Sequence, residues 1–317
     1  MWRVRLLAIA FLLAGCSVVS VDFTPRIEPL REKIVEGSGS SKILLLDLSG
    51  VLSEELTVTV GQARPRVPLL ARVREELTKA EEDEQVRALV VRINSPGGTV
   101  TASDILYREL SAFKARRKIP VIATLMDVAA SGGYYVALAA DLIVAHPTTV
   151  TGSIGVMMLT VNAEGLLQKV GVAPLTIKSG AKKDMGSPFR GLSEEERTIF
   201  QAVIDDLHRR FLSLVVKERR LSEDKVRELA DGRIFTAERA KALGLVDHVG
   251  YLEDALGAAR NAARLDTARV IVYHRPREYR ANIYAATQVP EPLEASLARL
   301  SSLLLGPGPR FLYLWWP

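Results

Sequence analysis

Ser131 is the first residue of this chain whose surroundings suggest chemistry. It stands in residues 127–137, DVAASGGYYVA, after a predicted strand and at the start of a predicted helix. Small neighbours let the backbone turn sharply at a serine, and the Gly132 N–H could donate to a carbonyl oxygen that becomes an oxyanion during nucleophilic attack. A structural role is the alternative, in which Ser131 caps the helix and the glycines permit close packing.

A second segment could complete an oxyanion hole. Residues 92–98 read RINSPGG, so a predicted strand ends in a rigid Pro-Gly-Gly turn with exposed N–H donors. The same turn could equally be an ordinary connection between a strand and a helix. Two further segments are distinctive, TGSIGV at 151–156 and KSGAKKDMGSPFR at 178–190.

Together these four segments resemble the signal peptide peptidase A family, a Ser–Lys branch of the Clp protease and crotonase-like superfamily. The resemblance extends from about residue 42 to about residue 250 and includes GRIF at 232–235 and LGLVD at 243–247. One such motif carries little information, whereas several in the same order and spacing are specific. The resemblance implies an α/β fold of stacked strand–helix units with oligomerising helices.

The resemblance also implies roles for the matching side chains. The nucleophile falls on Ser131 and the general base on Lys183, because Lys183 immediately precedes the aspartate of the family's Lys-Asp pattern. The neighbouring Lys182 occupies a variable position. Ser153 falls on the second serine, which holds the lysine amine. Ser131, Ser153 and Lys183 are chemically compatible with these roles, because a serine hydroxyl attacks a carbonyl carbon well when a base takes its proton. Lysine can be that base only as a neutral amine, the form that burial favours.

The backbone donors of the oxyanion hole fall on Gly98 and Gly132 by the same resemblance, with Gly97 as a less favoured substitute for Gly98. Metal or histidine chemistry is disfavoured, because the four histidines show no short metal-ligand spacing and the single cysteine, Cys16, lies near the N-terminus. A Ser-His-Asp triad is assembled in space, but no histidine here lies in a glycine-rich context. We therefore expect no metal and no cofactor.

The N-terminal residues predict a lipid anchor. Residues 1–15 read as a signal segment: Arg3 and Arg5 precede an apolar run that is too short to span a bilayer. The run ends in LAGC at 13–16, which resembles the bacterial lipobox and implies acylation of Cys16; an incidental cysteine is the alternative. We expect a lipid-anchored envelope protein that faces the periplasm or the cell exterior, in the inner or the outer membrane. The net charge is +5 with both arginines and +3 without them (5 − 2 = 3). Either value is too small to indicate that the protein binds nucleic acid.

The remainder is predicted to comprise a tether at 16–41, a peptidase domain at 42–280 and a tail at 281–317 that contains Pro and Trp. We expect the tail to pack on its own domain or oligomer rather than enter a membrane.

Ser103 and Ser193 are predicted helix caps. Hydrophobic periodicity predicts strands at 42–48, 86–93, 120–125 and 141–145, and helices at 67–82, 103–118, 131–140, 192–220, 222–230 and 236–243.

The function implied by the resemblance is endopeptidase cleavage of small apolar peptides, such as remnant signal peptides, beside a membrane. Relatives enclose their sites in ring-like or dome-like homo-oligomers, in some cases with catalytic residues shared between subunits. Sorting to an outer membrane would instead favour turnover of lipoproteins or envelope proteins. Two alternatives stay open: a crotonase-like acyl-CoA enzyme, whose chemistry does not need Ser131, Ser153 and Lys183, and a catalytically silent envelope scaffold.

Overall fold

The computed structural model describes residues 27–54, 67–276, 278–285 and 309–315. Cys16 and the signal segment lie outside these ranges. The elements in chain order are β1 (Arg31–Gly37), β2 (Lys42–Ser49), α2 (Leu69–Glu81), β3 (Val86–Ser95), β4 (Gly97–Thr99), α3 (Val100–Arg117), β5 (Val121–Ala130), α4 (Gly132–Ala137), β6 (Leu142–Ala145), β7 (Val150–Gly152), β8 (Met157–Leu159), α5 (Glu164–Lys169), α6 (Glu194–Arg219), α7 (Glu223–Leu229), β9 (Ile234–Thr236), α8 (Ala237–Leu243), β10 (His248–Val249), α9 (Leu252–Ala262), β11 (Arg269–His274) and β12 (Arg310–Leu314).

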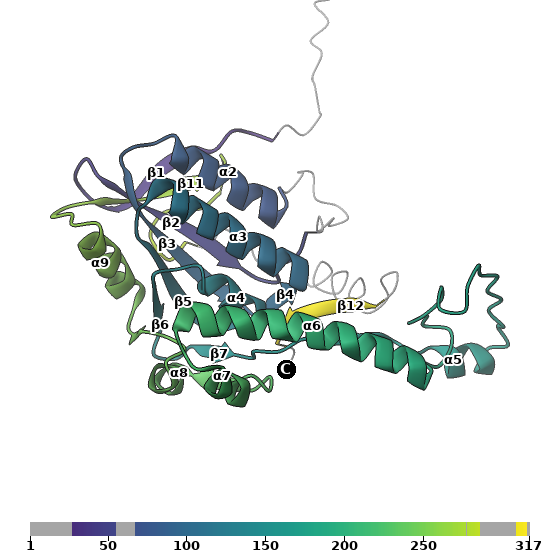
Figure 1. Cartoon of the computed structure of the whole chain (residues 1–317). Helices are drawn as coiled ribbons and strands as arrows, with labels where there is room; N and C mark the ends of the chain where they lie inside the picture. Colours follow the sequence, from purple (N-terminus) through teal and green to yellow (C-terminus); the bar gives the residue numbers. More distant parts are fainter. Residues whose placement is uncertain (1–26, 55–66, 277, 286–308, 316–317) are drawn as a thin grey trace, which may run out of the picture.

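A nine-stranded sheet forms the centre of the molecule, with the main strand order β1-β11-β2-β3-β5-β6-β10 (Figure 1). Strands β2, β3, β5 and β6 run parallel to one another, whereas β1 is antiparallel to β11. Parallel neighbours require crossover connections, which here are supplied mainly by helices, as the alternation in the sequence predicted. The predicted α/β class is confirmed.

Helices cover both faces of this sheet. Along β2, Leu44 and Leu46 point into the larger core, with α2, α3, α4 and α6, whereas Ile43 and Leu45 point into a smaller core under α9. Burial of both faces explains why β2 is an almost continuous apolar run rather than an alternating one. None of the described helices combines the length and the apolar character that crossing a bilayer requires.

The predicted strands and helices all form, with shifted ends, but the predicted cap of α3 is wrong. Thr99 is the cap residue, because its hydroxyl accepts a hydrogen bond from the Ala102 N–H (3.2 Å). Ser103 lies buried inside the helix and donates to the carbonyl of Thr99 (2.9 Å). The helix predicted at 131–140 ends at Ala137, and the chain then turns through Ala140 with tighter hydrogen bonds, such as that from Ala140 N–H to the Ala137 carbonyl (3.0 Å).

Two strands lie in segments predicted to be a tether and a tail. β1 pairs with β11 at one edge of the large sheet, so the folded domain includes residues before residue 42. β12 lies between β4 and β8 in a separate three-stranded sheet. The expectation that the tail packs on its own domain therefore holds for residues 310–314.

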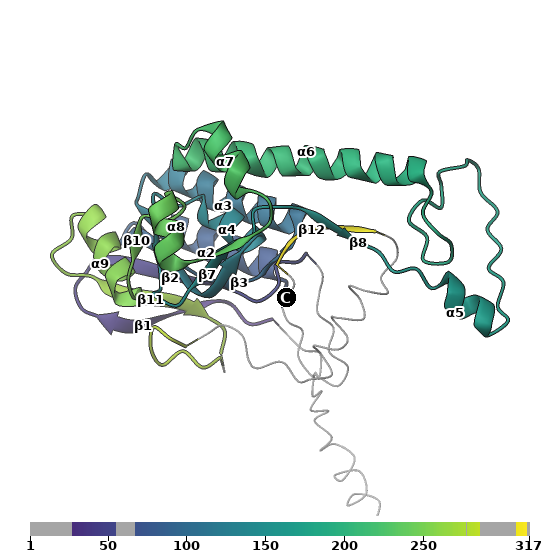
Figure 2. The same ribbon diagram turned by 90° about the horizontal axis from the view of Figure 1, so that it is seen from below.

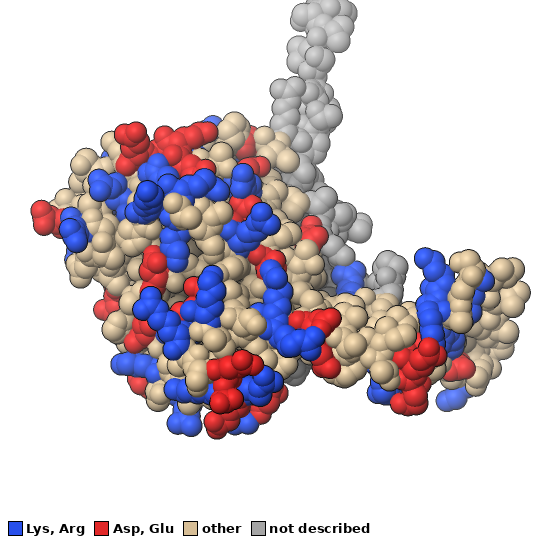
Figure 3. All heavy atoms as spheres, viewed as in Figure 1, with Lys and Arg blue, Asp and Glu red and all other residues tan. Residues whose placement is uncertain are grey.

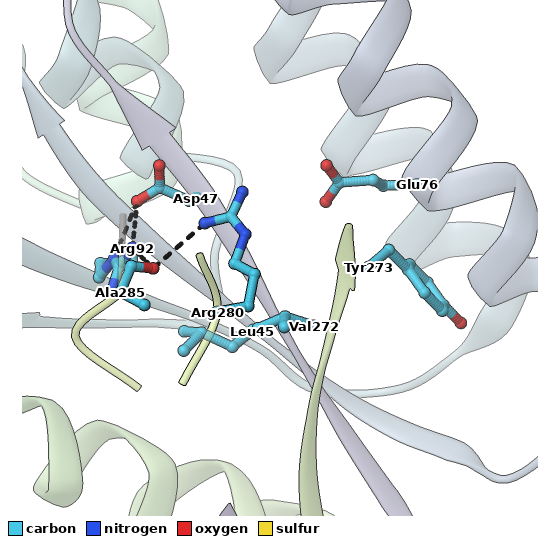
Figure 4. A pocket seen from close by; sticks show the side chains of 8 residues that line it. All are labelled: Leu45, Asp47, Glu76, Arg92, Val272, Tyr273, Arg280 and Ala285. Carbon is cyan, nitrogen blue, oxygen red and sulfur yellow. Dashed lines mark hydrogen bonds and ion pairs between the residues drawn. The ribbon is translucent and has the colours of Figure 1, made fainter. Parts of the chain in front are cut away.

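A buried ion pair fastens residues 283–285 to the sheet (Figure 4). Arg92 donates to the Asp47 carboxylate from Nε (2.9 Å) and Nη2 (2.7 Å), and it also binds the carbonyls of Ile283 and Ala285. Glu76 faces the same cluster, where burial raises the pKa of its carboxyl group. These charged side chains are engaged with one another and with the backbone, so we assign the cluster a structural role.

Residues 160–192, which we call the arm, stand off from the body of the molecule (Figures 1 and 2). The arm connects β8 to α6 and contains α5. The long helix α6 begins beside the arm and ends over the body, and so joins the two. Its start is fixed at Ser193, the predicted cap, by a capping box: Ser193 Oγ accepts from the Glu196 N–H (3.3 Å), and Glu196 accepts from the Ser193 N–H (3.0 Å).

We predict that Ser193→Ala lowers the free energy of unfolding by about 1 kcal/mol, because a helix N–H loses its acceptor. Thr198→Ala, on the exposed face of the same helix, should change it by less than about 0.5 kcal/mol. Urea denaturation curves would give both values. Equal effects of the two substitutions would contradict a capping role for Ser193.

Candidate active site

Ser131 turns the chain from β5 into α4. It is 1% exposed, and its backbone has φ 51° and ψ −115°, a conformation that costs free energy in any residue except glycine. Its N–H donates to the Gly152 carbonyl (2.8 Å), and its carbonyl accepts from the Tyr135 N–H (2.8 Å). The hydroxyl makes no cap hydrogen bond to the helix. The structural alternative, a capping serine, is therefore not what this residue does.

Ser153 lies beside Ser131 because of strand pairing. β5 and β7 are parallel, with Ala130 opposite Gly152, so the two serines follow equivalent positions at the same end of the sheet. Ser153 is also buried and has a positive φ, 50°, and its N–H donates to the Arg233 carbonyl (2.8 Å). The fold thus brings together two serines that the sequence separates.

The Pro-Gly-Gly turn approaches Ser131 so closely that only glycine fits. A Cβ on Gly97, whose φ is 102°, would lie 2.7 Å from the Gly132 nitrogen, and one on Gly132 would lie 2.3 Å from Ser103 Oγ. A Cβ on Gly98 would lie 1.8 Å from the Leu52 carbonyl oxygen. The two glycine segments predicted to form an oxyanion hole are therefore adjacent, and the turn is more than a loop: Gly97–Thr99 forms β4.

Of Gly97 and Gly98, Gly98 is the better candidate for the second oxyanion donor, beside Gly132. The Gly97 N–H already donates to Ser95 Oγ (3.1 Å), and the Gly97 carbonyl accepts from the Leu52 N–H (2.8 Å). Leu52 also accepts from the Thr99 N–H (2.9 Å), so the backbone of Leu52 holds the turn from its outer side. This contact involves a residue that the sequence motifs did not single out.

An aromatic pocket next to the glycines is the feature that sequence reasoning missed. Tyr135 and Phe211 line it, with ring centroids 5.0 Å apart, and Tyr313 of β12 fills it. Tyr135 is held by a hydrogen bond from its hydroxyl to Asp104 (2.7 Å), and burial raises the pKa of that hydroxyl, which keeps it a donor. The YY pair after the glycines was visible in the sequence, but its partner on α6 lies far along the chain.

Lys183 does not lie beside Ser131 in a single copy of the chain. It is exposed, in the turn at residues 180–186 of the arm, and its amine has no hydrogen bond or ion pair with any described residue. Gly186 packs against Pro309, at the far end of β12, whereas Gly132 packs near Tyr313. A strand rise of about 3.3 Å per residue separates those two ends of β12 by roughly 13 Å.

Charged side chains hold the turn that carries Lys183. Asp184 accepts hydrogen bonds from Arg190 (2.7 Å) and Lys178 (2.6 Å), and these bonds hold the pKa of its carboxyl group well below the usual range. Arg190 also donates to Glu196 at the start of α6, which lowers the pKa of Glu196 to about 2. The position of Lys183 is therefore tied to α6, and its amine meets no partner among the residues that the structure describes.

A strained, buried serine beside closely packed glycine backbone is the arrangement that a serine hydrolase site requires. Comparison with known proteins narrows the class. The model of peptidase family S49 matches residues 113–266, a range that contains Ser131, Ser153 and Lys183. A protein of Enterococcus faecium named as a signal peptide peptidase SppA is 38% identical over 78% of this chain and 71% of its own length. The chain belongs to peptidase family S49, the signal peptide peptidase A family, and is a serine protease.

Other relatives agree with this family. Protease 4 of Salmonella typhi is 37% identical over 60% of this chain and 30% of its own length. The chloroplastic serine protease SPPA of Arabidopsis thaliana is also 37% identical, over 60% of this chain and 28% of its own. The structure of a ClpP1 mutant from Listeria monocytogenes matches 67% of this chain and 94% of its own, with 18% identity and a TM-score of 0.43.

We predict that Ser131→Gly abolishes activity yet yields a protein about 1 kcal/mol more stable than Ser131→Ala. Both variants lose the hydroxyl, but only glycine relieves the positive φ. Thermal unfolding of the two variants, with labelling by a fluorophosphonate as the activity readout, measures both effects. A glycine variant less stable than the alanine variant would show that the residue is not strained.

Proposed function

We propose that this protein is a membrane-anchored serine endopeptidase that cleaves small apolar peptides, such as remnant signal peptides, with Ser131 as nucleophile and Lys183 as general base. The observation that carries the proposal is the meeting of a buried, strained Ser131 with Ser153 and two closely packed glycine segments, in a chain of family S49. Serine positioned in this way needs only a base to react.

The reaction follows from these groups. Lys183 takes the proton of Ser131 as the hydroxyl oxygen bonds to the peptide carbonyl carbon, and the N–H groups of Gly98 and Gly132 bind the oxyanion. The C–N bond then breaks, and Lys183 returns the proton to the leaving amine. Lys183 then takes a proton from a water molecule as the water oxygen bonds to the acyl carbon, and it returns that proton to the Ser131 oxygen as the acyl–serine C–O bond breaks. Ser153 orients the amine throughout and breaks no bond.

Lys183 would come from a neighbouring copy in a ring-like or dome-like homo-oligomer. The support is its position: it is exposed on an arm that stands clear of the body (Figure 3). The arm also carries large apolar side chains in solvent, among them Leu175 (89% exposed) and Ile177 (94%). Burial of such side chains against another copy would stabilise an assembly, and enclosure would favour the neutral form of the amine.

Lipid anchoring through Cys16 would place this oligomer at a bilayer surface in the bacterial envelope. Small apolar peptides left in a membrane would then be near the site. The support is the LAGC sequence that follows the apolar run at residues 6–13. Mass spectrometry of the protein from membranes would detect the acyl chains, and Cys16→Ser should release the protein from the membrane fraction.

We predict that Ser131→Ala and Lys183→Ala are each inactive and that a co-assembled mixture regains activity. A site needs serine from one copy and lysine from its neighbour, so an equal random mixture should have roughly a quarter of the wild-type sites. Co-expression with two affinity tags and cleavage of an apolar fluorogenic peptide would measure this.

The matched control is Lys182→Ala, since Lys182 pairs with Glu195 at the start of α6 and should be dispensable. Full activity of the Lys183→Ala protein would remove the dyad. A mixture that stays inactive, although each variant assembles, would mean that both residues act within one copy.

A further inference from the structure

Arg190 is the centre of the ion-pair network in the arm. Its Nη2 and Nε atoms donate to the two carboxylate oxygens of Asp184 (2.7 and 3.1 Å), and Nη2 also donates to the Asp184 backbone carbonyl (3.1 Å). Its Nη1 and Nη2 atoms donate to the two carboxylate oxygens of Glu196 (2.9 and 2.6 Å). A planar guanidinium with five donors can bind two carboxylates in this way, whereas a lysine amine cannot. One side chain therefore connects the residue after Lys183 to the first turn of α6.

Asp184 is held by a second cation as well. The Lys178 amine donates to the Asp184 carboxylate (2.6 Å) and to the Ala181 carbonyl (3.1 Å). The Asp184 side chain is only 12% exposed, although it lies in the arm. The backbone carbonyl of Asp184 also accepts from the Ser187 N–H (3.0 Å). The carboxylate of Asp184 is therefore bound on both oxygens and turned away from solvent.

Lys183 differs from the other two lysines of residues 178–183. Lys178 binds Asp184, and Lys182 pairs with Glu195. The side chain of Lys183 is exposed and makes no hydrogen bond or ion pair with a described residue. Further charged groups come from the elements that pack beside this turn: Glu164 of α5, Glu194, Glu196 and Arg197 of α6, and Arg310 of β12. Asp184, as the next residue in the chain, is the carboxylate that the Lys183 amine could reach most readily.

A free carboxylate beside Lys183 would oppose its proposed role. A general base must be neutral, and a negative charge within a few ångströms favours the ammonium form of a lysine instead. Two cations, Arg190 and Lys178, bind the one carboxylate that adjoins this lysine, so the amine keeps no anionic partner. The same bonds fasten the turn to α6, which would limit the positions that the amine can take.

We propose that Arg190 is a positioning residue for the base: it fastens the turn that carries Lys183 to α6, and it keeps the Asp184 carboxylate away from the Lys183 amine. The proposal rests on the proposed function in one respect, that Lys183 is the base. Arg190 touches no reacting atom and acts through Asp184 and Glu196. Loss of Arg190 would leave Asp184 with one cation fewer and the turn without its connection to α6.

The first test measures the Lys183 amine without any catalysis. A trace of acetic anhydride acetylates neutral amines in the full chain, and mass spectrometry follows Lys183 relative to the exposed Lys225 as pH varies. In Arg190→Gln the curve for Lys183 should move to higher pH by roughly half a unit at low ionic strength, and less at high salt. Adding Asp184→Asn restores the wild-type sum of charges and should return the curve.

The matched control is Arg197→Gln. It removes the same charge from an exposed arginine on α6, whose carboxylate contact, to Glu194, is long (3.7 Å). The Lys183 curve of this variant should coincide with that of the wild type. An equal shift in the control would show that any nearby charge has the same effect, which would overturn the specific role of Arg190.

The second test measures cleavage of an apolar fluorogenic peptide by assembled protein. Arg190→Gln should lower kcat roughly tenfold with little change in KM, because the base is misplaced. The acidic limb of its pH–rate profile should move to higher pH. Adding Asp184→Asn should restore the limb but not kcat, since the turn is still not fastened to α6. Arg190→Lys keeps the charge but not the paired hydrogen bonds, so kcat should fall while the limb moves less.

The outcomes separate this proposal from the dyad. If the folded Arg190→Gln protein gives the wild-type curve for Lys183, the effect on Asp184 is overturned, while fluorophosphonate labelling that requires Lys183 would still support the dyad. If the Lys183 curve moves but the acidic limb does not, the dyad is overturned and the role of Arg190 toward Asp184 stands. A wild-type kcat in Arg190→Gln would overturn the positioning role.

Discussion

The close approach of the Pro-Gly-Gly turn to the start of α4 is the constraint on which the site depends. Adjacent parallel strands β3 and β5 end at the same edge of the sheet, so the segments that follow them must meet. Gly97 and Gly132 allow the two backbones to come within a distance that any side chain would prevent. The contact brings two strand ends together beside Ser131, and substituting either of these glycines would push the two segments apart.

The same contact explains why Ser131 is held in a strained conformation. Its backbone is fixed on one side by the hydrogen bond to Gly152 and on the other by the short helix α4, which is buried throughout. A strained conformation persists only when the surrounding structure holds it in place. Here β5, its neighbour β7 and the helix α4 do so. These contacts set the position of Ser131 within the body of the molecule.

Lys183, the proposed base, is positioned by different means. Lys183 is carried by the arm, and the arm is fixed to α6 through Asp184, Arg190 and Glu196 rather than through the sheet. Ser131 and Lys183 therefore belong to parts of the chain that are held in place independently. Under the proposed function, assembly of copies would bring them together, and activity would follow from the oligomer and not from the fold of one chain.

β12 pairs on one edge with β4, the strand of the Pro-Gly-Gly turn, and on the other with β8, the strand that follows Ser153. The match to peptidase family S49 covers residues 113–266 and so ends before β12. The ring of Tyr313, the fourth residue of this five-residue strand, stacks on Tyr135 and so packs the strand against the body of the molecule.

The sequence determined those features that depend on local chemistry. Apolar runs marked the strands, the Ser193 capping box marked the start of α6, and the small residues around Ser131 marked a sharp turn, because sterics and periodicity act over a few residues. Tertiary structure decided the rest. The pairing of β12 with β4 and β8, and the meeting of Tyr313 with Phe211, join segments far apart in the chain, and no local pattern encodes the register of such contacts. The distance of Lys183 from Ser131 was hidden for the same reason, since it is set by how the arm leaves the body.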